Sequence, residues 1–244
     1  AEMLGLPGEV LRLGDKAQGL LLVVGPTGAG KSTTMACLID RINRSRRCRI
    51  ITIEDPVEYS HESHLATVDQ REVYQDTKSF SAALKFILRQ DPDVILVGEM
   101  RDLETISLAL TAAETGHLVL STLHTSSAVK AVDRIIDIFP SSQKGQIRSM
   151  MSESLEAVIA QKLIPTKDGK GRVPACEVMM ATTAIRNLIR EDRIYQIESV
   201  MQSGGVEGMQ TLDQDLQRLV AQGQIDRSMA AQIANNPKLF GTNI

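Results

Sequence analysis

The sequence predicts an α/β fold, in which a mainly parallel β-sheet is flanked by helices and followed by a helical C-terminal part. Largely apolar runs alternate with amphipathic stretches at the spacing of β-α-β units, whose crossovers place consecutive strands parallel in one sheet. A glycine-rich loop also lies directly between an apolar run and a helical stretch, which is the context that a phosphate-binding loop requires.

Four runs in the first half of the chain are expected to be strands buried on both faces, because they lack a polar alternation. They lie at residues 20–24, 49–53, 94–97 and 118–120. Helices are expected at residues 9–17, 31–44, 79–90 and 103–114. Pro56 ends the second strand because proline cannot donate to the ladder, and Gly116 ends the last of these helices.

The second half of the chain has a different pattern. Residues 126–163 are expected to be mainly helical, and the polar segment 167–171 is expected to be a hairpin turn before a strand at 173–180. Short helices follow from Thr182 onward. The predicted division is a core of residues 1–180 and a helical C-terminal subdomain of residues 181–244.

Composition restricts the class of protein. The 244 residues are 43% hydrophobic and carry a net charge of −3, so the chain can bury a core and has no general attraction to nucleic acid. Three isolated cysteines argue against a disulfide framework and a zinc ribbon, and they fit a reducing compartment. No apolar run has the roughly 18–20 residues of a membrane span, and no signal peptide pattern opens the chain. We therefore expect a cytoplasmic protein without a transmembrane segment, and the start at Ala1 leads us to expect a fragment.

A Gly-x-x-x-x-Gly-Lys-Ser pattern predicts a site for the phosphates of a nucleotide. The expected binding residues are Gly25, Pro26, Thr27, Gly28, Ala29, Gly30, Lys31, Ser32 and Thr33. The glycines let backbone N–H groups curl toward phosphate oxygens, and the following helix adds its positive end. Lys31 is expected to reach the β- and γ-phosphates and Ser32 to bind Mg²⁺. The Asn-Lys-x-Asp motif by which GTPases read guanine is missing, so ATP is the expected nucleotide.

Two acidic clusters follow the second and third strands, at the carboxyl ends where ligands of parallel sheets bind. Hydrolysis of a γ-phosphate needs carboxylates near the metal and the attacking water. Glu99 is the favoured candidate, although it follows Gly98, which holds the position of the usual Walker B aspartate, so its metal contact is expected to be indirect. Asp55, in the Glu54-to-Glu58 cluster, fits a turn cap about as well as a functional role.

Histidines are also present near the expected site. His124 ends the fourth strand on the same edge as the phosphate loop, and His117 precedes that strand. From the pattern alone, a hydrogen-bonded loop residue explains either histidine better than a role at a γ-phosphate. His61 and His64 are expected to lie in a solvated loop, because no third metal ligand stands near them.

The four segments 25–33, 52–59, 98–102 and 115–125 resemble, in order and spacing, the Walker A, Asp, Walker B and His boxes of secretion-type hexameric ATPases. The resemblance spans about residues 5–235 and implies a RecA-like core that couples ATP hydrolysis to mechanical work in a homo-hexamer. Residues 184–191 resemble the C-terminal signature of type IV pilus retraction ATPases. Such proteins carry an N-terminal PAS-like domain, which we expect to be missing here.

The resemblance also implies roles for single residues. Glu58 would be the general base, and Glu99 would act on the magnesium shell or on water. His124 would approach the γ-phosphate, with His117 in support. Arg101 and Arg134 would be structural or would act on a neighbouring subunit's nucleotide.

Three functions remain open at this point. The resemblance favours a motor for pilus retraction and twitching motility, located at the inner-membrane base of the pilus and in contact with an inner-membrane platform protein. A pilus-assembly or type II secretion ATPase is the first alternative, but those relatives usually carry a four-cysteine zinc site that three cysteines cannot build. A non-hydrolysing accessory subunit of such a motor is the second.

Overall fold

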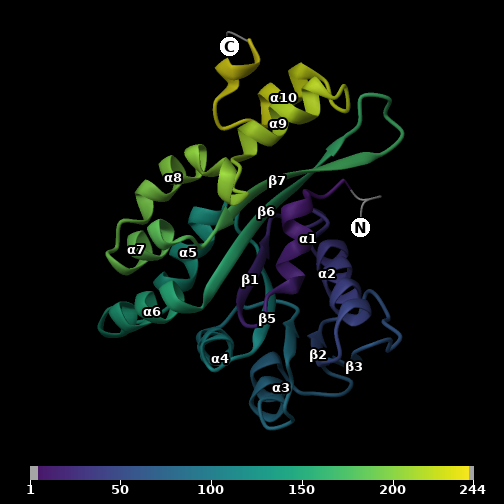
Figure 1. Ribbon diagram of the computed structural model, residues 1–244, viewed down its shortest axis with the longest axis vertical. Helices are drawn as coiled ribbons and strands as arrows, with labels where there is room; N and C mark the ends of the chain where they lie inside the picture. The colour runs from purple at the N-terminus through teal and green to yellow at the C-terminus, as the bar shows by residue number, and fades with distance from the viewer. Residues whose placement is uncertain (1–4, 242–244) are drawn as a thin grey trace.

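The computed structural model describes residues 5–241, which form a seven-stranded sheet of order β3-β2-β4-β5-β1-β6-β7 (Figure 1). The strands are β1 (Gly19–Val24), β2 (Arg49–Glu54), β3 (Thr67–Glu72), β4 (Val94–Val97), β5 (Leu118–Leu123), β6 (Leu155–Pro165) and β7 (Arg172–Met180). Every neighbouring pair among them is parallel except β6 and β7, which form an antiparallel hairpin. The predicted α/β class with a mainly parallel sheet is confirmed.

The described residues contain α1 (Gly8–Arg12), α2 (Lys31–Ser45), α3 (Phe80–Ile87), α4 (Leu103–Glu114), α5 (Ala128–Asp137), α6 (Ser141–Ser154), α7 (Thr183–Arg190), α8 (Ile197–Ser203), α9 (Leu212–Ala221) and α10 (Arg227–Ile233). Single 3₁₀ turns lie at Leu13–Asp15, Ile194–Gln196, Gly204–Glu207 and Pro237–Phe240. No helix among residues 5–241 is long and apolar enough to cross a membrane.

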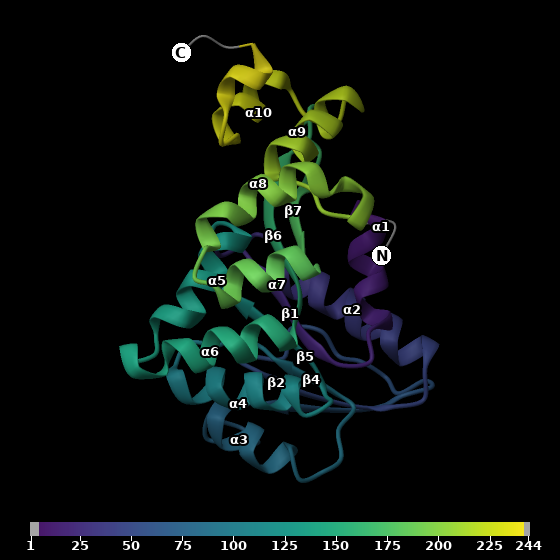
Figure 2. The same cartoon turned by 60° about the vertical axis from the view of Figure 1, so that its left-hand side comes forward.

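Two hydrophobic layers sandwich the sheet, and the alternation of β1 shows how they form. Leu20 and Leu22 point into the layer under α3, α4, α5 and α6, whereas Leu21 and Val23 point into the layer under α1 and α2. Both sets are fully buried, which explains why β1 reads as an uninterrupted apolar run. Figure 2 shows the helices on their two sides of the sheet. This burial holds the carboxyl ends of β1, β2, β4 and β5 in fixed positions along one edge.

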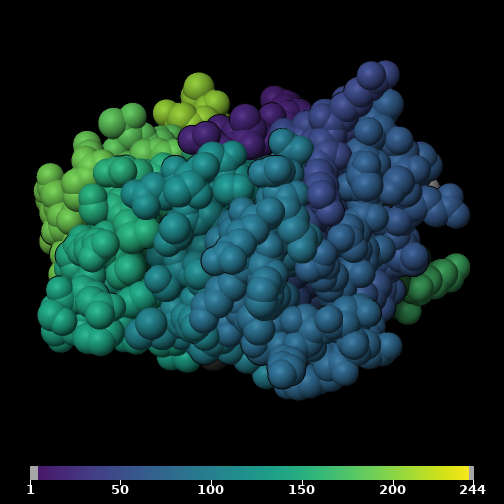
Figure 3. All heavy atoms as spheres, turned by 90° about the horizontal axis from the view of Figure 1, so that it is seen from below, coloured from purple at the N-terminus to yellow at the C-terminus, as the bar shows by residue number. Residues whose placement is uncertain are grey.

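The C-terminal part divides into two packing units. Helices α7 and α8 share the hydrophobic layer of α3 to α6, whereas α9 and α10 pack with Ile164, Val173 and Ala175 around the far end of the β6–β7 hairpin. The turn of this hairpin projects beyond the body of the protein, as the green segment at the edge of Figure 3. The chain leaves β7 at Met180, but the division into residues 1–180 and 181–244 stays a prediction because α7 and α8 belong to the core layer.

Two strands were missed by the sequence prediction. The expected helical region 126–163 is wrong from Leu155 onward, where α6 gives way to β6. Glu156, Gln161 and Lys162 break the apolar run of β6 and conceal its strand character. The edge strand β3 has a single neighbour, β2, and consists largely of polar, half-buried residues, so its sequence resembles a loop.

Candidate active site

The phosphate loop leads from the buried end of β1 into α2. Gly25, Gly28 and Gly30 have φ angles of 152°, 77° and 87°, a region that residues with a side chain rarely adopt. Gly30 is the N-cap of α2, so the free N–H groups in the first turn of that helix point toward the interior of the loop. The spacing of the glycines therefore produces the curled backbone that the sequence predicts.

Lys31 lies inside this curl. Its Nζ donates to the carbonyl oxygens of Gly25 at 2.9 Å and Pro26 at 3.0 Å. Burial lowers the pKa of the Lys31 ammonium from its ordinary value, and the negative charges of Glu99 and Glu58 partly offset that effect. The loop thus holds a cation at its centre, where a phosphate would replace the two carbonyl partners.

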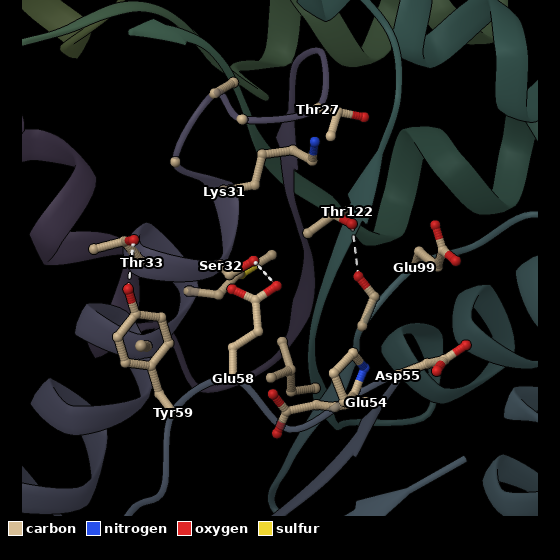
Figure 4. A pocket seen from close by; sticks show the side chains of 18 of the residues that line it. Thr27, Lys31, Ser32, Thr33, Glu54, Asp55, Glu58, Tyr59, Glu99 and Thr122 are labelled. Carbon is tan, nitrogen blue, oxygen red and sulfur yellow. Dashed lines mark hydrogen bonds between the residues drawn. The ribbon is translucent and has the colours of Figure 1, made fainter. Parts of the chain in front are cut away.

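The segment after β2 lies across the first turn of α2. Ser32 Oγ donates to Glu58 Oε1 at 3.0 Å, and Thr33 Oγ1 and Tyr59 OH are 2.9 Å apart in a second hydrogen bond (Figure 4). Glu58 is exposed, and Ser32 Oγ is its hydrogen-bonding partner among the described residues. A carboxylate is therefore next to the hydroxyl that the motif assigns to magnesium.

Glu99 follows β4 and contacts two side chains, Arg101 and His124. Arg101 Nε lies 2.6 Å from Glu99 Oε1, and His124 Nε2 lies 3.4 Å from Glu99 Oε2. The side chain of Glu99 is 15% exposed, against 45% for His124 and 74% for Arg101. The pair Glu99–His124 thus joins the ends of β4 and β5, as the order of the strands predicts.

The backbone explains why the acidic residue comes one position later than in a standard Walker B strand. A Cβ atom on Gly98 would lie 3.1 Å from the Ile53 carbonyl oxygen and 3.4 Å from the Phe80 ring. Thr122 Oγ1 donates to the Gly98 carbonyl oxygen at 2.6 Å, which holds this residue against β5. A side chain at Gly98 would therefore require its neighbours to shift by a few tenths of an ångström, and the acidic side chain of this segment is found at the next position, Glu99.

These groups line a cavity of about 560 Å³, a size that suits a small ligand. Among its lining residues are Thr27, Gly28, Ala29, Gly30, Lys31, Ser32, Thr33, Glu58, Glu99, Arg101 and His124. Gly25 and Pro26 take part through the carbonyl groups that hold Lys31. The structure thus brings the residues proposed for binding and catalysis to one place.

Three other expectations have different outcomes. His117 lies before β5, at the opposite end of that strand from His124, where its Nδ1 is 3.0 Å from the Ala112 carbonyl oxygen. Arg134 is exposed on α5 and is not among the residues that line the cavity. His61 and His64 lie in a loop as expected, and His64 is exposed, but His61 is half-buried and lines the cavity, and burial lowers its pKa.

Sequence reasoning missed several residues of the site. Leu163 and Arg172 reach the cavity from the β6–β7 hairpin, far along the chain from the four motifs. Tyr59 stands in the recognised second motif, but its contact with Thr33 depends on the fold of the segment after β2. No short-range pattern could have marked the two hairpin residues, because tertiary packing alone brings them to the phosphate loop.

The oxygen and nitrogen groups that line the cavity fit Mg²⁺ and a nucleoside triphosphate. Mg²⁺ in such sites takes few protein ligands and completes its shell with phosphate oxygens and water. Among residues 5–241, no cluster of three or more His, Cys, Asp or Glu side chains could hold a metal without such a ligand. The Ser32 hydroxyl and the nearby Glu58 and Glu99 carboxylates fit a metal that arrives with the nucleotide.

Comparisons with known proteins agree with this geometry. The family described as "Type II/IV secretion system protein" matches residues 7–239. The "Type IV pilus retractation ATPase PilT" of Pseudomonas aeruginosa is 58% identical over 98% of this chain and 69% of its own length. The "Twitching motility protein" of Neisseria gonorrhoeae is 55% identical over 96% of this chain and 63% of its own length.

A solved structure shows the same fold. The crystal structure of the pilus retraction motor PilT with bound ADP superposes with a TM-score of 0.91 at 51% identity, covering 98% of this chain and 67% of that one. The chain thus spans about two thirds of the length of these relatives. It belongs to the type II/IV secretion system protein family, among the PilT-like ATPases.

Proposed function

We propose that this chain is the ATP-hydrolysing region of a homo-hexameric motor that powers type IV pilus retraction and twitching motility. One observation carries the proposal: the Ser32–Glu58 and Glu99–His124 contacts meet the phosphate loop at a single cavity. Two relatives, one named as a retraction ATPase and one as a twitching motility protein, support the same function.

The binding roles follow from the loop. Residues 25–33 would surround the phosphates with backbone N–H groups, and Lys31 would exchange its two carbonyl partners for phosphate oxygens. Ser32 would supply a ligand to Mg²⁺, which neutralises the charge that develops on the phosphates when it is bound. Glu99 would act on the same metal through water, consistent with its place two residues after the end of β4.

The catalytic roles follow from the number of partners that each carboxylate has. Each oxygen of Glu99 has a side-chain partner, Arg101 at one and His124 at the other, whereas the exposed Glu58 has one hydrogen bond among residues 5–241, from Ser32 to its Oε1. A general base needs a free lone pair within reach of water. We therefore assign proton abstraction to Glu58, the orientation of His124 and Arg101 to Glu99, and stabilisation of the γ-phosphate to His124.

The proposed setting is a ring on the cytoplasmic side of the inner membrane, in contact with the platform protein at the base of the pilus. Arg101 and His124 line the cavity and are exposed, so a neighbouring subunit or a further domain could contact them there. The net charge of −3 supports a protein partner over nucleic acid.

ATP turnover by the purified protein tests the enzymatic part. Lys31→Ala and Glu99→Ala should each lower kcat/KM by orders of magnitude, because they remove interactions with the transferred phosphoryl group or its metal. Lys170→Ala, in the exposed hairpin turn, is the matched control and should retain the normal rate. Full activity in both site variants would refute the proposed mechanism.

Pilus counts separate retraction from assembly or secretion. Loss of a retraction motor should leave extra, immobile pili, whereas loss of an assembly motor should leave none. The three cysteines are unpaired, and one of them, Cys176, is buried in β7, so they support retraction over the zinc-containing relatives. Protein that binds ATP and never hydrolyses it would instead indicate the accessory subunit.

A further inference from the structure

Gln161 is a buried polar residue of β6 that none of the four motifs contains. Strand β6 pairs in parallel with β1, and Ala160 stands opposite Val24, the last residue of β1. Gln161 therefore lies beside Gly25, where the phosphate loop begins. Gln161 is only 3% exposed, so contact with solvent does not explain an amide at this position.

Both ends of the Gln161 amide are used by the phosphate loop. Thr34 Oγ1, in the first turn of α2, donates to Gln161 Oε1 at 2.8 Å, and Gln161 Nε2 donates to the Ala29 carbonyl oxygen at 2.8 Å. A carbonyl oxygen only accepts, so the contact with Ala29 determines which end of the amide is the nitrogen. One side chain thus joins the two residues, Ala29 and Thr34, that flank the Gly30–Thr33 segment.

Gln161 also explains why two loop positions are glycine. A Cβ atom on Gly25 would lie 2.4 Å from the Gln161 carbonyl oxygen, and one on Gly30 would lie 2.8 Å from Gln161 Nε2. Contacts this short essentially never occur for real Cβ atoms, so the Gln161 backbone requires glycine at position 25, and a Cβ at position 30 would displace the Gln161 amide from its place beside the loop. The loop is shaped against β6 as well as by its own φ angles.

We propose that Gln161 is a positioning residue for the nucleotide phosphates. The amide holds Ala29 and Thr34 in place, and so aims the N–H groups between them at the β-phosphate without touching the nucleotide. The inference rests on the proposed function only in taking an adenine nucleotide as the ligand. It adds the β6–β7 hairpin to the parts of the fold that determine how tightly phosphate binds.

Nucleotide binding by the full-length protein tests this role. Gln161→Met keeps the size of the side chain and removes both hydrogen bonds, so the dissociation constant of Mg-ADP should rise about ten- to hundredfold. The dissociation constant of AMP, which lacks the β-phosphate, should change much less. Gln210→Met is the matched control: Gln210 Nε2 donates to the carbonyl oxygen of Cys176, the residue opposite Gln161, away from the loop.

A second variant keeps the test decisive if Gln161→Met does not fold. Thr34→Val removes one of the two hydrogen bonds and should weaken Mg-ADP binding by roughly threefold to tenfold, and Thr34→Ser should restore it. Equal losses of ADP and AMP affinity, or Mg-ADP binding as tight as in the unaltered protein, would overturn the inference. Because binding is measured without turnover, a protein that fails to hydrolyse ATP would refute the proposed motor and leave this result interpretable.

Discussion

The two halves of the site are built differently. The phosphate loop is held by buried contacts: Lys31 bonds to the loop carbonyls, and Gln161 joins Ala29 to Thr34. The acidic half consists of side chains on segments that follow β2, β4 and β5, and Glu58 and His124 are exposed. The difference indicates that the fold preforms the phosphate loop before nucleotide binds. The catalytic side chains, in contrast, are oriented by one another and by the ligand in the cavity.

The largest expected effect separates catalysis from binding. Glu58→Gln keeps a hydrogen-bond acceptor for Ser32 but removes the base, so kcat for ATP hydrolysis should fall by about 10²- to 10⁴-fold with little change in Mg-ADP affinity. Steady-state turnover and equilibrium binding measure the two quantities. Glu62→Gln, an exposed carboxylate in the same segment, is the control. A parallel loss of binding would mean that the acidic half also holds the nucleotide.

The next largest effect tests the half of the site formed by the phosphate loop. Gly30→Ala places a Cβ 2.8 Å from Gln161 Nε2 at a φ of 87°, so the loop must shift and Mg-ADP affinity should fall by about ten- to hundredfold. Gly145→Ala in α6 is the control, because no atom lies near its added Cβ and the position is helical. Unchanged ADP binding in Gly30→Ala would contradict a loop whose shape is determined before nucleotide arrives.

A smaller effect is expected where the halves meet. Tyr59→Phe removes the hydroxyl that bonds Thr33, and the KM for ATP should rise by about two- to tenfold while kcat changes less. Tyr74→Phe is the matched control, since Tyr74 is 81% exposed. A change in kcat alone would place Tyr59 with the catalytic groups.

The smallest effect concerns Glu177, a buried carboxyl that contacts the start of the helix after His124. Glu177 on β7 accepts from Ala128 N at 2.6 Å, at the start of the helix that follows His124, and burial raises the pKa of its carboxyl. The folded state therefore binds more protons than the unfolded state, so Glu177 stabilises the fold most below the ordinary glutamate pKa. That contribution is lost as pH rises through the raised value.

Glu177→Gln should flatten this part of the pH dependence, by on the order of 1 kcal/mol in the free energy of unfolding. Denaturant titrations at several pH values measure it, and Glu114→Gln, which changes an exposed carboxylate that is not among the groups shifting the Glu177 pKa, is the control. An unchanged pH profile in Glu177→Gln would show that the buried carboxyl has the same affinity for protons in both states.

Much of the fold was predictable, for a reason that β1 and β3 illustrate. The apolar run of β1 is a strand with helices on both faces, and its pattern needs no knowledge of its neighbours. The polar strand β3 is a strand only because β2 lies beside it. The same contrast separates residues 118–120, which were predicted, from β6, whose polar residues include the amide that serves the phosphate loop.

The site divides in the same way. Spacing along the chain is enough to recognise the loop from Gly25 to Thr33, because its glycines, lysine and hydroxyls act within one turn of backbone. The contacts of Glu58 with Ser32 and of Glu99 with His124 were predicted only as neighbours on one edge of a sheet. Gln161 and Thr34 are 127 positions apart, so the packing of β6 against β1 alone decides that they meet. Adjacent residues determine the backbone conformation of the phosphate loop. Distant residues that share the buried sheet stabilise that conformation, and only the tertiary structure brings them together.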